Sequence, residues 1–383
     1  MDRRLFLEQT AMAGIASLLG SIASINELPQ KKIRIAVIGC GSVSTQYLPH
    51  LSKCEYVELV SCCDRKFDRA EEKAKTYSIP NKYASIEALL NGAAFDLLVN
   101  LTDMQEHEQL NRKALTAGKN VWSEKPMANS YAGGKALLEL AESKKLRFWG
   151  APAVVNSPQF AFMSEQLKKG TLGTVATAHA HYGHTGPTWS AFFYEKGGGS
   201  LPDLGVYNIA TLTGLLGPAK AVMAMTSIVT PKRTVDDKGT IDVKAEDNAH
   251  IILDHGKGVM SHIQCGFNYF DPYGHEGKGQ KNHTIKIWGS HGNMGLIGYD
   301  WAPFGVELAT SWTEPPVVHV PDPGTYVWQQ GASVIATALA TQTEPRINAY
   351  HALHVLEIIE AARASSDQGK KITLQSSFPW PMI

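Results

Sequence analysis

The sequence predicts an α/β fold with two parts: an N-terminal doubly wound parallel (Rossmann) sheet, and a C-terminal α+β domain with a large, mainly antiparallel open sheet. A β-branched run at residues 33–38 breaks at Gly39 and Gly41, and short apolar strands then alternate with helical patterns as far as Gly150. After Gly150 longer strands dominate. We therefore expect an export signal and linker at 1–30, a dinucleotide-binding domain at 31–150 and a substrate-binding and oligomerisation domain at 151–383.

The elements follow from periodicity and from turn residues. In the first domain we expect strands at 33–38, 57–63, 95–100, 120–123 and 147–149, and helices at 45–51, 67–77, 85–90, 105–117 and 131–144. In the second we expect strands at 174–182, 219–230, 247–253, 258–265 and 284–288, and helices at 160–169, 334–341 and 350–364. The stretch 268–282 is rich in glycine and polar residues and predicts a mobile loop.

Composition narrows the class of protein. The chain has 383 residues, 44% of them apolar and 19% charged, with 36 basic and 36 acidic residues. A formal charge of zero gives no indication of a nucleic-acid or acidic-polymer partner. We see no stretch of about 18 strongly apolar residues, so we expect no membrane span in the mature chain. The five cysteines fit no metal motif, and we interpret them as buried and reduced.

The first 30 residues resemble a twin-arginine export signal. Arg3 and Arg4 precede Leu5 and Phe6, a mildly apolar segment covers residues 11–25, and Ser21 to Ala23 supply small residues for cleavage. We therefore expect a periplasmic protein that is exported already folded, with its cofactor bound. The alternative is a frayed amphipathic N-terminus.

The glycine turn predicts a phosphate site. Gly39 and Gly41 let the backbone approach a ligand, and the N–H groups that come next, at Ser42 and Val43, point at the anion. Asp64 ends the second strand, 23 residues after Gly41, where a carboxylate can hold the ribose hydroxyls. The alternative is an ordinary βαβ unit with a glycine-rich turn.

The choice between NAD and NADP depends on the two basic residues directly after Asp64. Arg65 and Lys66 could bind the 2′-phosphate of NADP or be solvated charges at the start of a helix. Because Asp64 would repel that phosphate, we favour NAD and leave NADP open. Thr102 and Lys125 also come directly after strand ends, so these side chains should converge on one crevice with Gly39 and Asp64.

Two motifs carry a family resemblance. Glu124-Lys125-Pro126, together with the segment GGGSLPDLGVY at 197–207, resembles the Gfo/Idh/MocA family of nicotinamide-dependent sugar and cyclitol oxidoreductases, over residues 31 to about 374. Thr102 and His107 also match, although Asp103 replaces a usual proline. The resemblance implies a nicotinamide cofactor contacted by these residues and by Glu124 and Lys125, and a cis peptide bond before Pro126. The leader is similar to that of glucose–fructose oxidoreductase and of the exported NAD-dependent glycosidases of this fold.

The same residues make chemical sense for alcohol oxidation. Removal of hydride from a carbinol carbon requires a base for the hydroxyl proton. Asp203 and Tyr207 are four residues apart and share a helix face if Pro202 opens a helix. We assign Tyr207 as general acid/base, Lys125 as the cation that polarises the substrate oxygen and lowers the tyrosine pKa, and Asp203 as the group that orients the sugar and holds Lys125. The alternatives are a packed tyrosine, a surface lysine and a helix-cap carboxylate.

Weaker candidates lie between the two motifs. His184 and Trp189 precede the active-site helix and are candidate substrate-binding residues, with core packing as the alternative for the tryptophan. His179 and His181 would share a strand face, but we see no thiol or carboxylate that would complete a site with them, so we predict no metal.

We therefore expect an exported NAD(P)-dependent oxidoreductase that transfers hydride between a tightly bound cofactor and a hydroxyl of a sugar, cyclitol or glycoside. One alternative is a redox-neutral NAD-dependent glycoside hydrolase or lyase that acts through a transient keto-sugar; a second is a non-catalytic sugar sensor. An exposed sheet face predicts a homodimer or homotetramer.

Overall fold

The structure is a computed structural model that describes residues 32–273 and 282–382. The described residues from Ile33 onward form one compact unit. The predicted export signal and most of the predicted loop at 268–282 lie outside the described residues. Within the described ranges, none of the helices combines the length and the apolar character that a membrane span requires.

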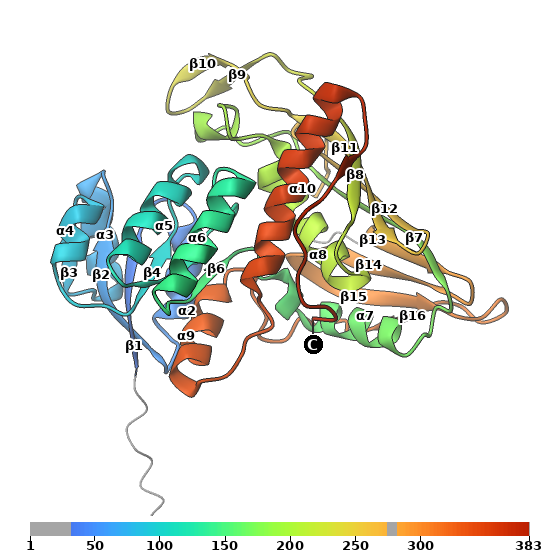
Figure 1. The fold of residues 1–383 in the computed structure, drawn as a ribbon, viewed down its shortest axis with the longest axis horizontal. Coiled ribbons are helices and arrows are strands. Elements are labelled where there is room, and N and C mark those ends of the chain that lie inside the picture. Colours follow the sequence, from blue (N-terminus) through green and yellow to red (C-terminus); the bar gives the residue numbers. More distant parts are fainter. Residues whose placement is uncertain (1–31, 274–281, 383) are drawn as a thin grey trace, which may run out of the picture. The chain divides into compact units, whose positions relative to one another are not determined.

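The N-terminal sheet is parallel and has six strands in the order β3-β2-β1-β4-β5-β6, which confirms the doubly wound prediction. Its strands are β1 (Ile33–Ile38), β2 (Val57–Cys63), β3 (Asn81–Tyr83), β4 (Leu97–Asn100), β5 (Asn120–Ser123) and β6 (Phe148–Gly150). The order reverses between β1 and β4, and a crevice at the carboxyl ends of these strands is where such sheets bind ligands. Figure 1 shows this sheet beside its helices in blue and teal.

The helices that join these strands are α2 (Ser44–Leu51), α3 (Phe67–Tyr77), α4 (Ile86–Asn91), α5 (His107–Thr116) and α6 (Tyr131–Ser143). Ser85 and Ser130 cap α4 and α6, because each hydroxyl accepts a hydrogen bond from a first-turn N–H. The predicted helix at 105–117 begins differently: its first turn, Met104–Glu106, is a 3₁₀ helix (η1) that runs into α5.

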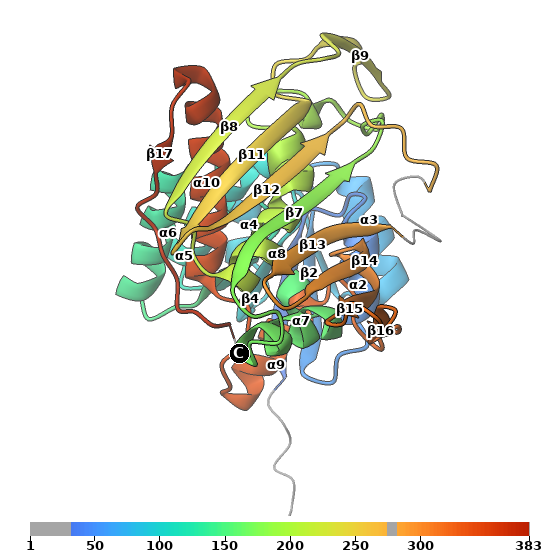
Figure 2. The ribbon, with the colours of Figure 1, turned by 90° about the vertical axis from the view of Figure 1, so that its right-hand side faces the viewer.

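The second sheet has nine strands in the order β16-β15-β14-β13-β7-β12-β11-β8-β17. Its neighbours pair antiparallel except β7 and β12, which are parallel, so the sheet is mixed but mostly antiparallel. The strands are β7 (Val175–Gly183), β8 (Ala221–Ser227), β11 (Asn248–Gly256), β12 (Val259–Gly266), β13 (His283–Gly289), β14 (Asn293–Tyr299), β15 (Ala302–Ala309), β16 (Val317–His319) and β17 (Ile372–Thr373). Figure 2 shows the sheet face-on, with helices behind it.

Sequence patterns missed the last part of this sheet. The segment at 293–309 forms β14 and β15, although glycines and aromatic residues hide its alternation. A separate hairpin of β9 (Lys232–Val235) and β10 (Gly239–Asp242) was also not predicted.

Helix α8 (Val206–Leu216) lies at the centre of the second domain. All of its residues except the last are buried, because it packs on the sheet, on α7 (Pro158–Lys168) and on α10 (Ala349–Gln368). The turn before it, Leu201–Gly205 (η4), is π-helical, so the chain enters α8 through a widened turn and not through the regular helix expected from Pro202. The late helix α9 (Gly331–Thr341) returns to the first domain and packs against α2.

Candidate active site

The glycine turn after β1 leaves backbone N–H groups available to a ligand. Gly39 has a φ of +90°, and a Cβ there would lie 2.5 Å from the backbone carbonyl carbon of Leu101. Within the described ranges, the N–H groups of Gly41, Ser42 and Val43 donate to no other group. Three available donors at the start of α2 suit the phosphates of a dinucleotide.

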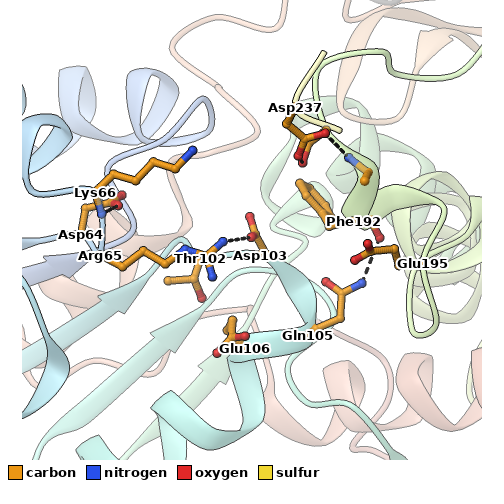
Figure 3. Close-up of polar contacts among 12 residues, drawn as sticks. Asp64, Arg65, Lys66, Thr102, Asp103, Gln105, Glu106, Phe192, Glu195 and Asp237 are labelled. Atoms are coloured by element: carbon orange, nitrogen blue, oxygen red, sulfur yellow. Dashed lines mark hydrogen bonds and ion pairs between the residues drawn. The ribbon is translucent and has the colours of Figure 1, made fainter. Parts of the chain in front are cut away.

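Asp64 connects this turn to the turn after β2. Its Oδ2 accepts a hydrogen bond from the N–H of Cys40, and its Oδ1 accepts one from the N–H of Lys66, each at 2.8 Å. Each carboxylate oxygen keeps a further lone pair, so the fixed carboxylate can still accept hydrogen bonds from ribose hydroxyls. Figure 3 shows Asp64 and Lys66 at one side of the crevice.

The Arg65 side chain turns along the crevice. Its Nη2 lies 3.2 Å from Oδ2 of Asp103, the residue that stands where proline is usual, and Figure 3 shows this ion pair between the ends of β2 and β4. Burial raises the pKa of Asp103, and the charge of Arg65 opposes that rise. A second guanidinium was not predicted: Nη1 of Arg69 would lie 3.4 Å from a Cβ on Gly41, above the phosphate turn.

His107 and Thr102 join the ends of β4 and β5. The buried imidazole of His107 lies between two carbonyl oxygens, with Nδ1 2.7 Å from Pro126 O and Nε2 2.9 Å from Thr102 O. Burial lowers the pKa of His107, and a neutral imidazole can donate to only one of the two. Thr102 donates its hydroxyl proton to Asn100 Oδ1 at 2.7 Å. The side chains of Thr102 and His107 therefore hold the backbone at the ends of β4 and β5 in place.

Glu124 orients the loop after β5. Its Oε1 accepts the Tyr47 hydroxyl proton at 2.6 Å, and its Oε2 accepts the N–H of Lys125 at 2.9 Å. The peptide bond between Lys125 and Pro126 is cis, as the family resemblance implied. The hydrogen bond between Tyr47 and Glu124 ties this loop to α2. Lys125 projects toward the second domain, where it contacts Asp203.

Lys125, Asp203 and Tyr207 come together as predicted from the two motifs. The Lys125 Nζ lies 2.8 Å from Asp203 Oδ1 and 2.9 Å from the Asp203 carbonyl oxygen. The same Nζ lies 5.1 Å from the centre of the Tyr207 ring. The side chains of the ion pair are only 11% and 13% exposed, so their attraction is little screened by water.

The expectation that Lys125 lowers the pKa of Tyr207 is wrong for this arrangement. The pKa of Tyr207 is raised well above its usual value, first by burial and then by the charges of Glu124 and Asp203. Lys125 faces the Tyr207 ring, and the Asp203 carboxylate balances its charge. Lys125 therefore does not offset the rise in the pKa of Tyr207. Tyr207 is therefore protonated at neutral pH and suited to donate a proton.

Two aromatic rings contact Tyr207, and neither was predicted from the sequence. The Tyr207 ring centre lies 5.8 Å from that of Trp328 and 6.4 Å from that of Tyr182. His184 lies one ring further away, 6.0 Å from Tyr182, and its Nδ1 accepts the N–H of Gly186 at 2.9 Å. Trp189 is 44% exposed and stands edge-on to Phe193, so it lies at the surface of this segment.

The two domains also touch beside the crevice. Gln105 Nε2 donates to the carbonyl oxygen of Phe192 at 2.9 Å, as Figure 3 shows. On the far side of the same segment, Asp237 of the β9–β10 hairpin accepts from Ser190 Oγ at 2.7 Å, and Lys238 pairs with Glu195. These contacts hold the segment 184–200 against the site. No pattern in the sequence indicated them.

Comparisons with known proteins agree with this geometry. Residues 33–151 match the family model described as an oxidoreductase family with an NAD-binding Rossmann fold (GFO_IDH_MocA), and residues 160–294 match the GFO/IDH/MocA C-terminal domain.

Relatives with assigned names include bovine trans-1,2-dihydrobenzene-1,2-diol dehydrogenase, 25% identical over 71% of this chain and 76% of the relative. D-apiose dehydrogenase of Paraburkholderia graminis is 23% identical over 90% of this chain and 91% of the relative. Among solved structures, the aldose-aldose oxidoreductase of Caulobacter crescentus, complexed with glycerol, has the same fold, with a TM-score of 0.77 at 20% identity over 90% of this chain and all of that one.

The two family models together cover most of the chain, and the glycine turn and the Asp64 carboxylate suit the NAD-binding Rossmann fold that the first model describes. This protein is a member of the Gfo/Idh/MocA family of NAD-binding oxidoreductases.

Proposed function

We propose that this enzyme oxidises a secondary hydroxyl of a sugar or a related polyol, and reduces the corresponding carbonyl, by hydride exchange with NAD. The observation that carries the proposal is the meeting of Lys125, Asp203 and Tyr207 at the carboxyl end of β5, beside the phosphate turn. Among the relatives, one is named D-apiose dehydrogenase and another scyllo-inositol 2-dehydrogenase (NADP(+)), which supports a polyhydroxylated substrate.

The chain supplies the groups that manage the hydroxyl proton. The nicotinamide would accept or supply the hydride. The hydroxyl of Tyr207, with its raised pKa, donates a proton to a carbonyl oxygen in the direction of reduction. In oxidation the phenol must first lose its proton, which becomes easier if the substrate draws the Lys125 ammonium away from Asp203 and toward the reacting oxygen.

The phosphate turn and Asp64 would hold the cofactor by direct contact. The donors at Gly41, Ser42 and Val43 fit the diphosphate, and Asp64 fits the adenosine ribose. Arg65 is engaged by Asp103, which supports NAD over NADP. Lys125 reaches the same crevice from the end of β5.

The test uses protein purified without added nucleotide. It is mixed with free sugars, cyclitols and chromogenic glycosides, while the near-ultraviolet band of reduced nicotinamide and the release of aglycone are followed together. A lasting band without aglycone release supports the oxidoreductase. Aglycone release without a lasting band would instead establish the redox-neutral glycosidase. If added NAD neither binds nor is reduced with any substrate, the proposed function is wrong.

We propose in addition that the first 30 residues direct export by the twin-arginine route, which would place the enzyme in the periplasm with its cofactor already bound. The support is the pair Arg3-Arg4 ahead of Leu5-Phe6 and an apolar segment. Replacement of both arginines by lysine should leave the protein in the cytoplasmic fraction. Unchanged distribution between fractions would refute export by this route.

A further inference from the structure

Asp300 is a buried carboxyl behind the active-site helix. It lies where β14 turns into β15 and is 2% exposed. Its Oδ2 accepts hydrogen bonds from Asn208 Nδ2 and from Thr211 Oγ1, both at 3.0 Å. Asn208 and Thr211 belong to α8, and Asn208 is the next residue after Tyr207. The carboxyl therefore ties the helix that carries Tyr207 to the sheet.

Two buried oxygen atoms beside these hydrogen bonds lack a donor of their own. Asp300 Oδ1 and Asn208 Oδ1 are both buried, and neither accepts a hydrogen bond of regular geometry from the part of the chain that the structure describes, although the N–H groups of Asp300 and Trp301 lie close to the carboxyl. An ionised carboxylate and an amide carbonyl are both acceptors, so they cannot satisfy each other. One added proton would satisfy both atoms.

We propose that in weakly acidic solution Asp300 carries a proton on Oδ1 and donates it to Asn208 Oδ1. The carboxylic acid and the amide then form a cyclic pair, in which the amide N–H donates to one carboxyl oxygen and the acid O–H donates to the amide oxygen. The proton comes from solvent, and no covalent bond other than its O–H bond forms. Asp300 is thus a positioning residue. It holds α8 in place, and through Asn208 it fixes the helix backbone next to Tyr207.

The surroundings of Asp300 favour the neutral acid. Burial raises the pKa of Asp300 to about 6, against the opposing effect of its donors Asn208 and Thr211 and of the backbone N–H groups of Asp300 and Trp301. Among the described residues, Tyr182 on β7 and Tyr326 ahead of α9 are titratable groups close enough to Asp300 to interact with its charge. Burial raises the pKa of both tyrosines, so both are neutral at these pH values, and a tyrosine has no positive form that would hold Asp300 ionised.

Infrared difference spectroscopy tests the proton directly. The spectrum of wild type minus that of Asp300→Asn should contain the carbonyl band of a protonated carboxylic acid, which fades as the pH rises through about 6. The matched control is Asp242→Asn, because Asp242 is exposed on the β9–β10 hairpin, where it pairs with Lys232 and takes no part in the buried arrangement. If the Asp300 difference spectrum shows only carboxylate bands down to about pH 4, the proposal is overturned.

A comparison of two variants distinguishes a role of the carboxyl proton from a role in packing alone. An asparagine at 300 can donate to Asn208 Oδ1 and accept from Asn208 Nδ2, as the protonated acid does, whereas leucine can do neither. In assays below about pH 6 we expect Asp300→Asn to keep most of the activity and Asp300→Leu to lose about 10-fold or more. Equal loss in both variants would mean that the ionised carboxylate is required, which contradicts the proposal.

Stability supplies a readout that needs no substrate. The folded-state pKa is higher than the value of about 4 expected in the unfolded chain, so protonation favours the folded state below that value, and this advantage is lost as the pH rises through about 6. Relative to Asp300→Asn, the folding equilibrium constant of wild type should fall by about 100-fold between about pH 3 and about pH 7. A ratio that does not fall with pH would refute the proposal. The activity test rests on the proposed function, but the infrared and stability tests do not, so the two ideas can fail separately.

Discussion

The ammonium group of Lys125 lies 2.8 Å from Asp203 Oδ1 and 2.9 Å from the carbonyl oxygen of the same residue. This double contact joins the end of β5 to the π-helical turn that opens α8, so the ion pair links the N-terminal domain to the C-terminal domain. Both side chains are mostly buried. The pair therefore has a structural and a chemical role, which substitutions can separate.

Lys125→Met should lower kcat by about 10²- to 10⁴-fold and destabilise the protein by about 3 kcal/mol, because it removes the cation that we propose acts on the reacting oxygen and leaves Asp203 buried without this partner. The double variant Lys125→Met/Asp203→Leu should recover most of the stability but none of the activity, as thermal unfolding and NAD-coupled assays would show. Recovery of activity in the double variant would exclude a chemical role for Lys125.

The raised pKa of Tyr207 predicts a directional pH dependence. The rate of hydroxyl oxidation should increase by about tenfold per pH unit from pH 7 to about 10, because only the ionised phenol accepts a proton, whereas carbonyl reduction should stay flat over this range. Initial rates measured in both directions across this pH range would check it. Tyr207→Phe should remove the slope together with nearly all activity, while NAD binding persists. A plateau of the oxidation rate below about pH 8 would mean that Tyr207 is not the base.

Much of the site could be predicted because its residues come at strand ends. Asp64 and Lys125 lie just after parallel strands, and topology alone brings such positions to one edge. Asp203 and Tyr207 could be joined to them because they are close in sequence. The direction of the Tyr207 pKa shift could not be predicted, since it depends on burial and on Glu124, which another loop supplies.

The missed residues depend on long-range contacts. Asp300 meets Asn208 across 92 positions, and Trp328 reaches Tyr207 from the segment before α9. Periodicity describes which face of an element is buried but not which distant side chain covers it. Arg65 shows the same limit: its basic character suggested a phosphate ligand, but its partner Asp103 lies 38 positions further along the chain.

Arg363 of α10 should stabilise the entrance to the active-site helix. Its Nε and Nη2 bind the two oxygens of the buried Glu246 at 2.9 Å each, and Glu246 Oε1 also accepts the N–H of Leu201 at 3.2 Å. Arg363→Met should cost about 2 kcal/mol in the free energy of unfolding, because the carboxylate loses its partner. The control Arg147→Met breaks an exposed pair with Glu344 and should change stability by no more than about 0.5 kcal/mol. Equal losses in the two variants would contradict this role for Arg363.

Asp103 should limit the affinity for NADP. Removal of its carboxylate in Asp103→Ala releases Arg65 from the pair at 3.2 Å, so the guanidinium can bind a 2′-phosphate. We expect the Kd for NADP to fall by about tenfold, with the Kd for NAD unchanged within about twofold, in titrations of intrinsic tryptophan fluorescence. Glu71→Ala, which releases Lys82 from a similarly exposed pair, is the control and should alter neither value. If Asp103→Ala leaves the ratio of the two Kd values unchanged, Arg65 does not lie within reach of the 2′-phosphate.

Gly39 should be indispensable for nucleotide binding. Its φ is +90°, and a Cβ at this position would lie 2.5 Å from the backbone carbonyl carbon of Leu101, so alanine must push the end of β1 away from β4. Gly39→Ala should therefore raise the Kd for NAD by at least about 100-fold, which calorimetric titration of the purified variant would measure.

The matched control is Gly170→Ala. Gly170 also has a positive φ of +71°, but no atom of the described chain lies within 4 Å of the place a Cβ would take, so this variant carries the backbone strain without the collision. It should lose about 1 kcal/mol of stability and bind NAD like the wild type. If Gly39→Ala loses no more affinity than Gly170→Ala, the close approach of the turn to β4 does not shape the phosphate site, and the diphosphate must be held elsewhere.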